Sequence, residues 1–372
     1  MRRRQCGLTL IELLIVMTIS IVVVDAAVSL LLANASSGNT SAALSSVSDN
    51  GRVALNFIGD AVRSGGYMAC NATNDLREIV PAGQTRQINV LQAGATPVQR
   101  NYNNAFGGYE AAASAPGGAL NVAAMPIAAD NNAGDWINAG GLDALLVGKV
   151  TQGSDVLVVR ESLPQAIPIY TTAAYVTATG QTTLAVNSVG SMQPGQFAVI
   201  SNCTVSTAFQ VGTVSAAGKV IGTAGALNQF GGELKWSYQF PTPITPVDMY
   251  IFFIGPGRDT DSSLWEYDEL LGTFQELVPD VENMQVLYGE APTSPNQVTQ
   301  FVTADQVANF NQVVSVKVAL LVASPPGTAA VQAATAGTVQ PFSLLYATVT
   351  PPLDTRLRKA FDTTIAVRNA AL

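Results

Sequence analysis

Apolar residues dominate the chain from residue 8 to residue 32, and only Glu12 and Asp25 carry a charge inside this stretch. A helix over 8–32 rises about 1.5 Å per residue and is about 38 Å long, which is enough to cross a bilayer with some tilt. Three arginines at 2–4 precede the stretch, and a basic head of this kind stays in the cytoplasm. The pattern predicts a transmembrane helix over 8–32, with the bulk of the chain on the far side of the membrane.

A second helical pattern follows, in which apolar or small residues recur at steps of three and four: Leu44, Val47, Gly51, Leu55, Ile58 and Val62. The paired glycines 65–66 provide a stop signal. The stretch 34–40 (NASSGNT) is a weak helix former, so we expect a bend or a frayed turn there. The sequence therefore predicts one helix over 8–66, interrupted near 34–40, whose second half docks on a head domain.

The head, 67–372, contains short β-branched or aromatic runs between Gly, Pro and Asn turns. The runs expected to form strands are Val156–Arg160, Phe197–Ser201, Phe209–Val214, Leu234–Phe240, Met249–Ile254, Val286–Tyr288 and Val313–Ala323. They predict an α+β fold with a large, mostly antiparallel sheet system behind the helix. The Ala-, Gly- and Asn-rich stretch 101–141 is expected to be an exposed loop, and three prolines suggest a sub-boundary near 241–246.

Composition excludes several classes of function. The chain contains no histidine, which excludes His-based nucleophilic dyads and His-liganded zinc. The formal net charge is −8 and lysines are few, so we expect no direct binding of nucleic acid. Phosphate-binding, dinucleotide and nucleophile-elbow motifs are missing from the sequence, so we expect neither an enzyme nor a cofactor.

Two acidic segments are candidates for calcium. A calcium loop of the EF-hand type that starts at Asp259 needs Gly at its sixth position and Glu at its twelfth, where this chain has Leu264 and Leu270. The second segment is the oxygen cluster of Asp130-Asn131-Asn132 with Asp135. For 257–269 we expect a solvated acidic hairpin, and we predict no metal site.

Glu12 distinguishes between the interpretations of the N-terminus. A carboxylate inside an apolar helix needs a partner, and cleavage after Gly7 would leave an amino group on Leu8, one turn or about 6 Å from Glu12. Three alternatives remain open: an ordinary secretory signal cut after the Ala-Asn-Ala of 33–35, a lipoprotein signal at Cys6, and a plain membrane anchor. Asp25 lies about 20 Å beyond Glu12, near the outer interface, where we expect it to be solvated.

This N-terminus resembles the class III signal of type IV pilins and pseudopilins. In that family a short basic leader ends in Gly, and Glu occupies the fifth position of the apolar helix that follows; here these residues are Gly7 and Glu12. The resemblance implies that prepilin peptidase removes the leader 1–7 and methylates the new N-terminus. Leu8 stands where the family usually has Phe, so cleavage is better supported than methylation.

Further segments resemble the PilW-like minor pilins. In chain order they are Asn50-Gly51-Arg52, Gly66-Tyr67-Met68-Ala69-Cys70, Gly153 to Arg160, Val281 to Gly289 and Arg356-Leu357-Arg358-Lys359; the stretch from Leu91 to Leu142 matches no segment of that family. The resemblance implies a single-pass inner-membrane protein with a periplasmic head, which joins a type IV pilus and serves twitching motility, adhesion or DNA uptake. It implies as partners other minor pilins, the major pilin and the inner-membrane assembly platform, with Glu12 as the assembly residue.

The cysteines fit the same interpretation. Cys6 lies in the leader, which leaves Cys70 and Cys203 as an even pair delivered to an oxidising periplasm, and we predict that they form a disulfide. Two alternatives for function stay open, a J-type pseudopilin of type II secretion and an anchored or secreted adhesin.

Overall fold

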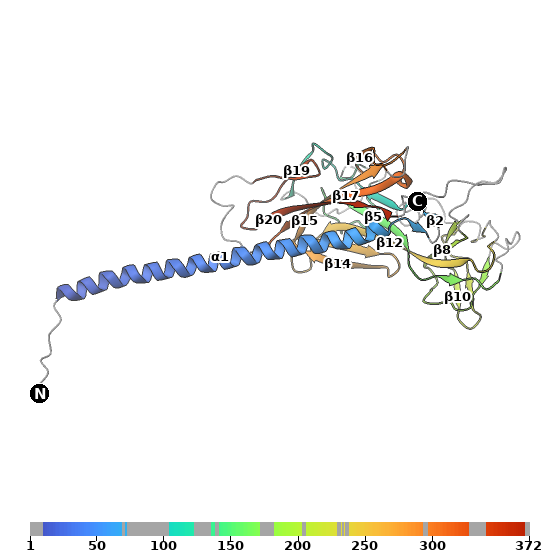
Figure 1. Ribbon diagram of the computed structural model, residues 1–372, viewed down its shortest axis with the longest axis horizontal. Coiled ribbons are helices and arrows are strands. Elements are labelled where there is room, and N and C mark those ends of the chain that lie inside the picture. Colours follow the sequence, from blue (N-terminus) through green and yellow to red (C-terminus); the bar gives the residue numbers. More distant parts are fainter. Residues whose placement is uncertain are drawn as a thin grey trace, which may run out of the picture.

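The computed structural model describes residues 10–68, 71–72, 104–122, 135–137, 141–171, 182–202, 206–228, 232, 234, 238–292, 297–326 and 340–368. A long helix, α1 (Leu10–Ser64), projects from a β-rich head, and the N-terminal end of this helix lies farthest from the head (Figure 1). The helix is continuous through 34–40, so the predicted bend is wrong. Leu and Ala are frequent in the turns before this stretch, and burial of Ala43 and Val47 in the head stabilises the turns after it. Weak propensity at a few positions therefore does not break the helix.

The larger sheet of the head has eight strands. Five of them follow one another across the sheet, namely β14 (Thr273–Pro279), β13 (Ser263–Asp268), β12 (Pro243–Gly255), β5 (Val156–Ser162) and β3 (Phe106–Tyr109). The other three extend the sheet from the first half of β12, namely β6 (Ile167–Pro168), β8 (Phe197–Ser201) and β9 (Ser206–Gln210). The long strand β12 thus joins two parts of the head. It begins inside the predicted sub-boundary of 241–246, which stays a prediction.

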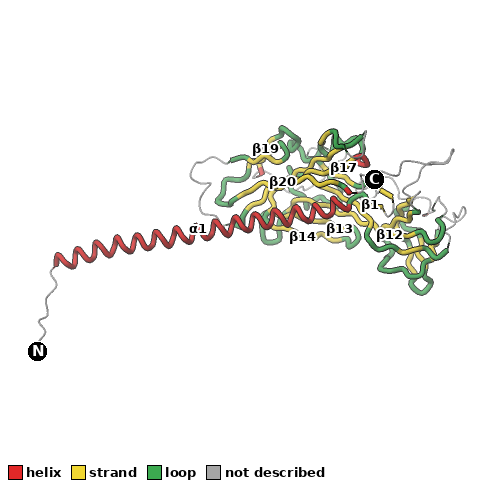
Figure 2. The backbone as a smooth tube through the Cα atoms, in the orientation of Figure 1, coloured by secondary structure: helices red, strands yellow, loops and turns green. Residues whose placement is uncertain are grey.

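A second sheet of four strands lies beside the first. Its order is β16 (Gln300–Val302), β15 (Val281–Glu290), β17 (Val313–Ala323) and β20 (Arg358–Ala366), with the short helix η4 (Phe310–Gln312) before β17. The second half of α1 crosses both sheets (Figure 2). Its buried side chains and those of both sheets form one apolar cluster, which includes Ile58 from the helix, Phe252 from β12 and Leu320 from β17.

Three smaller sheets complete the described head. Their strands are β1 (Tyr67–Met68) with β2 (Asn71–Ala72); β10 (Thr213–Ser215), β11 (Val220–Gly222) and β7 (Thr183–Ala185); and β18 (Phe342–Leu344), β19 (Ala347–Thr350) and β4 (Ala119–Asn121). Among the described strands the pairing of β19 with β4 is parallel and all others are antiparallel. The predicted α+β class, a long helix on a mostly antiparallel head, is confirmed.

The prediction of a loop over 101–141 is wrong in two places, because β3 and β4 lie within it. Strand β3 has the sequence FGGY, and its two glycines hide it from a propensity argument. Packing requires the second of these glycines: a Cβ on Gly108 would lie 2.8 Å from the carbonyl oxygen of Val156 and would also overlap the hydroxyl of Tyr288. The strand therefore depends on a close approach that only the folded head reveals.

Candidate functional site: the projecting helix and its junction with the head

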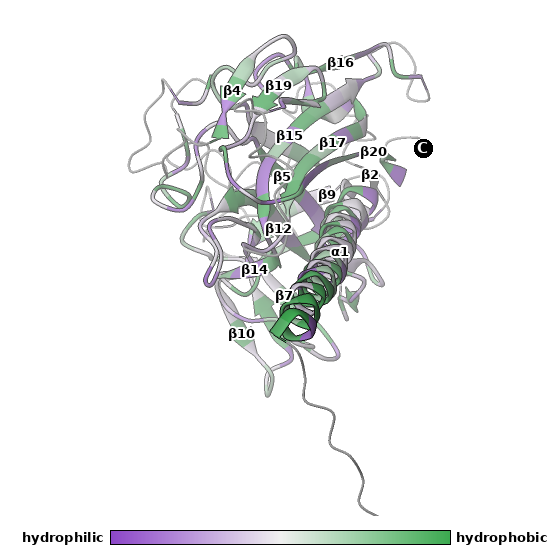
Figure 3. Cartoon of the chain, turned by 90° about the vertical axis from the view of Figure 1, so that its left-hand side faces the viewer, coloured by the Kyte–Doolittle hydropathy of each residue, from purple (hydrophilic) through white to green (hydrophobic). Residues whose placement is uncertain are grey.

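The first half of α1 is an apolar surface that the head does not cover. Its large side chains from Leu10 to Leu32 are exposed, and the first buried residue of the helix is Ala43. Viewed along the helix from its N-terminal end, the nearest turns are strongly hydrophobic (Figure 3). Among the described helices this one is long and apolar enough to cross a membrane. Such a surface is stable only in lipid or against other apolar helices.

The predicted processing and assembly residues lie at the start of this surface. Gly7 and Leu8 fall outside the described residues, so the cleavage site stays a prediction. Glu12 lies in the first turn of α1 and is exposed, as is Asp25 further along the same helix. Their roles, pairing for Glu12 and solvation for Asp25, stay predictions as well.

The second half of α1 docks on the head through small and branched residues. The buried positions are Ala43, Val47, Gly51, Ala54, Ile58, Gly59 and Val62. The predicted face was nearly right, but Leu44 is exposed and Leu55 only half-buried, and two alanines take their places. At Gly51 an added Cβ would lie 2.5 Å from Cε2 of Phe361 on β20, so the ring of Phe361 fills the space that a side chain would need.

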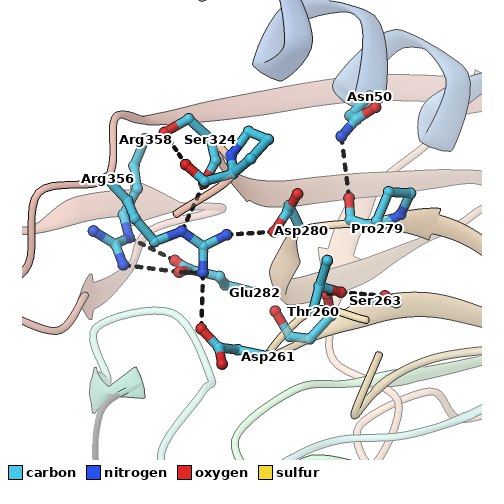
Figure 4. Close-up of polar contacts among 12 residues, drawn as sticks. Asn50, Thr260, Asp261, Ser263, Pro279, Asp280, Glu282, Ser324, Arg356 and Arg358 are labelled. Carbon is cyan, nitrogen blue, oxygen red and sulfur yellow. Dashed lines mark hydrogen bonds and ion pairs between the residues drawn. The ribbon is translucent and has the colours of Figure 1, made fainter. Parts of the chain in front are cut away.

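The segment Asn50-Gly51-Arg52, singled out from the sequence, lies at this junction. Asn50 Nδ2 donates a hydrogen bond of 3.2 Å to the carbonyl oxygen of Pro279, at the end of β14 (Figure 4). Gly51 faces Phe361, and Arg52 points outward and is exposed. Two of the three residues therefore fix the position and rotation of the helix on the head.

Directly beyond Pro279, a buried ion-pair network ties the C-terminal segment to β15 (Figure 4). Arg356 donates to Asp280 (2.5 Å), to the carbonyl oxygen of Ser324 (2.6 Å) and to Asp261 (3.1 Å). Its guanidinium and the Asp280 carboxylate are almost fully buried, with 5% and 4% of the side chain exposed. A buried charge of this kind is tolerated only when such partners surround it.

Arg358 completes the network with two carboxylates. It forms two parallel bonds to Glu282, of 2.7 and 2.8 Å, and two to Asp354, of 2.6 and 2.7 Å. Burial works against the charged guanidinium, but these hydrogen bonds outweigh it and raise the pKa of Arg358 above its ordinary value. For the Asp354 carboxylate, burial by itself raises the pKa, but the hydrogen bonds from Arg358 outweigh burial and the pKa is lowered overall. Both groups stay charged at neutral pH.

Two further segments that the sequence singled out bind each other across the seam between the two sheets. The carbonyl oxygen of Gly153 accepts bonds from Asn283 Nδ2 (2.8 Å) and Gln285 Nε2 (3.1 Å). Met284 N donates to Ser154 Oγ (3.0 Å), and its carbonyl oxygen accepts from Asp155 N (2.9 Å). The polar residues of these segments therefore join the start of β5 to β15.

Asp155 extends the seam to the segment after β3. Its carboxylate accepts from the backbone N–H of Ala111 (2.9 Å) and Val286 (2.8 Å). Ser114 Oγ lies 3.1 Å from Asp155 Oδ1, 3.0 Å from Glu110 Oε1 and 2.7 Å from the carbonyl oxygen of Ala111. All three of these neighbours are oxygen acceptors, whereas the Ser114 hydroxyl has one hydrogen to donate. If Glu110 is protonated, its carboxyl group donates to Ser114 Oγ, and this contact becomes a hydrogen bond that Ser114 accepts.

The pKa values of Glu110 and Asp155 also indicate a proton shared between these two carboxyl groups. Burial, and next the charge of Asp155, raise the pKa of Glu110 well above its ordinary value. Burial also raises the pKa of Asp155, against the hydrogen bonds that lower it. The other titratable groups facing the pair are Asp305, whose charge adds to both effects, and Tyr288 on β15. The pair therefore keeps one proton at neutral pH.

Sequence reasoning missed Glu110 and Ser114, because they lie in the stretch 91–142 that carried no recognised motif. A single acid in an Ala- and Gly-rich segment gives no local signal. The one pointer was Asp155, which lies inside a recognised segment and directly precedes the buried strand β5.

Several described side chains of the two acidic segments make contacts within the head. In the acidic hairpin between β12 and β13, Asp261 pairs with Arg356, and Arg258 lies 3.6 Å from Glu276. Within the described residues no three His, Cys, Asp or Glu side chains are grouped to hold a metal ion. Of the second oxygen cluster, only Asp135 is described, and it accepts a bond of 2.6 Å from Gln152. Cys70 and Cys203 lie outside the described residues, so the disulfide stays a prediction.

Two family models match segments near the two ends of the chain. Residues 2–24 match the model of the prokaryotic N-terminal methylation motif, and residues 251–369 match the model of the type IV pilus-assembly protein W. The first match contains Gly7, Leu8 and Glu12, and the second contains the β15 and Arg356–Arg358 segments. The predicted resemblance is thereby confirmed.

One solved structure is similar, a type IV-like pilin named TTHA1219 from Thermus thermophilus. It is 18% identical, the match covers 48% of this chain and 86% of that one, and the TM-score is 0.20, which carries no argument about the fold. No curated protein matched the chain.

Proposed function

We propose that this chain, which carries a prepilin-type methylation motif at one end and a PilW-type segment at the other, is a minor pilin that takes part in type IV pilus assembly. Its role is structural. The head supplies a rigid support for the second half of α1, and the first half supplies the surface that enters the membrane and then the pilus.

The observation that carries the proposal is the division of one unbroken helix into two environments. Residues from Ala43 onward are buried at regular steps in the head, whereas Leu10 to Leu32 are exposed and apolar. A soluble protein does not expose such a surface, and an ordinary signal peptide would not continue as a rigid helix into the core of its own protein. A pilin needs both halves.

The finer steps follow from this division. In the inner membrane the helix is a single span with the head in the periplasm, and prepilin peptidase cuts after Gly7 and methylates Leu8. The processed helix then packs beside those of other minor pilins and the major pilin on the inner-membrane assembly platform, where the complex primes or tips the pilus. In that bundle Glu12 neutralises the amino group of its own or a neighbouring Leu8.

The mass of the mature protein tests the proposal. We expect a chain that begins at Leu8, and a variant with Gly7→Glu that keeps its leader. The variant with Gly38→Glu is the matched control, because Gly38 lies on the same helix with no atom of the head within 4 Å, and it should be processed normally. A mature chain that begins at Ser36 would indicate ordinary signal cleavage and would refute the proposal.

A deletion strain separates pilus from secretion. Loss of surface pili and of twitching motility, with protein secretion unchanged, is the expected result. Loss of secretion with intact pili would favour the J-type pseudopilin, and a normal pilus with loss of surface attachment would favour the adhesin.

A further inference from the structure

The projecting half of α1 carries one more carboxylate than its single chain start can neutralise. Glu12 and Asp25 are both exposed on a helix without a break, thirteen residues apart. At about 1.5 Å and 100° per residue they are separated by about 20 Å along the axis and lie on nearly opposite sides of the helix. One partner cannot contact both.

The head cannot supply the missing positive charge. The first buried residue of α1 is Ala43, which lies about 27 Å beyond Asp25 along the axis. From Leu8 to Gly51 the sequence contains no lysine or arginine, and Arg52 is the first cation of the processed helix. The amino group expected on Leu8 is about 6 Å from Glu12 but about 26 Å from Asp25.

Copies of this chain packed side by side therefore leave a charge unmatched. Each copy would bring one amino group and two carboxylates into an apolar bundle, and an axial shift that brings a neighbour's amino group to Glu12 leaves it about 20 Å from Asp25. In the membrane Asp25 can reach water near the outer interface, whereas neighbouring helices packed against this side of α1 would cover Asp25 and exclude that water. An ionised carboxylate in such surroundings requires a cation or a strong hydrogen-bond donor.

Resting on the proposed function, we propose that Asp25 selects the neighbour of this chain: a different pilin helix that places a basic or N–H-donating side chain opposite Asp25, in preference to a second copy. Glu12 is the charge that any processed pilin can match with its amino group, and Asp25 is the charge that only a complementary partner matches. The chain thus joins a bundle in company with other subunits and is disfavoured as a homopolymer.

Charge exchange at position 25 tests the proposal in the full-length protein. Two differently tagged full-length chains are expressed together with prepilin peptidase and cross-linked in native membranes. Wild type paired with the Asp25→Lys variant should cross-link about tenfold more than wild type with itself, because the variant supplies the missing cation at the same depth. Asp25→Leu should raise self-association by about tenfold and lower co-purification with the cell's other pilins by a similar factor.

The Asp49→Asn variant is the matched control, because Asp49 is an exposed acid of the same helix in its docked half, and it should change neither measurement. If Asp25→Leu and Asp25→Lys associate with themselves and with other pilins as wild type does, while every chain is processed to Leu8, Asp25 selects no partner and the proposal is wrong. A wild-type chain that is not processed at Gly7 refutes the proposed function instead, and this proposal with it.

Discussion

The two halves of α1 are the same element held by different means. Four of the seven buried residues in the docked half are glycines or alanines, and the other three are Val47, Ile58 and Val62. This half therefore depends on the fit of Gly51 to Phe361 and of Asn50 to Pro279. The projecting half exposes large apolar side chains from Leu10 to Leu32. The docked half is therefore held by close packing against the head of the same chain. The projecting half depends on the lipid or the neighbouring helices that surround it.

Replacing Arg356 should cause the largest loss of unfolding free energy. The loss should concern the head with the docked half of α1 and leave the projecting half unaffected. Replacement by alanine leaves Asp280 as an unpaired buried charge directly beyond the Pro279 contact of Asn50, and the expected loss is about 3–5 kcal/mol of unfolding free energy. Urea unfolding of the detergent-solubilised full-length chain measures it. Arg52→Ala, at an exposed arginine of the helix, is the control and should be within about 0.5 kcal/mol of wild type.

Truncating one isoleucine in each half compares the two directly. Ile58→Ala should cost about 2–5 kcal/mol of head stability, since its side chain is fully buried. Ile15→Ala, at a position 52% exposed, should leave the unfolding of the head unchanged and instead weaken membrane or pilin association. Equal losses of head stability would show that the projecting half is not independent of the head.

Glycine substitutions sharpen the same contrast. Gly51→Ala forces a methyl group against the ring of Phe361 and should cost about 1–3 kcal/mol. Gly38→Ala meets nothing within 4 Å and should stabilise the helix by about 0.5–1 kcal/mol. Circular dichroism and urea unfolding of the two variants measure these opposite signs, and a stabilising Gly51→Ala would contradict the docking of the helix.

A smaller effect concerns pH and the seam under the helix. The pKa of Glu110 is raised in the folded head, so the folded state keeps a proton that the unfolded chain releases above its ordinary value near 4.5. Stability from this group is complete below that pH and falls as the pH rises toward the raised pKa. Thermal unfolding between pH 5 and 9 should therefore show a decreasing midpoint.

Glu110→Gln mimics the protonated form and should flatten that decrease, at about 1.4 kcal/mol for each unit by which the folded pKa exceeds the unfolded one. Asp248, whose pKa burial and the nearby charge of Asp268 raise to about 6, adds a dependence of the same sign that Glu110→Gln leaves in place. A variant with an unchanged slope would show that Glu110 does not hold the proton.

The local sequence pattern was enough to predict the elements with a strong hydrophobic periodicity. The apolar run, the three- and four-residue steps that follow it and the long strands such as β17 and β5 were predicted at or near their bounds. The prediction failed where a residue's role depends on a distant one, as at Gly108 beside Val156 and Tyr288, or at Ser114 between Glu110 and Asp155.

By itself, the sequence determined that one end of this protein is a charge-poor apolar helix with an acid at the fifth position after a glycine, because hydropathy and spacing along a helix are local properties. Only the tertiary structure showed what the recognised segments do. Asn50 and Gly51 fix the helix on the head, Gly153 to Asp155 bind Asn283 to Gln285 across the two sheets, and Arg356 and Arg358 bind Asp280 and Glu282. These hydrogen bonds and ion pairs join residues that are 76 to 229 positions apart, so they depend on positions in space that no single stretch of the chain records.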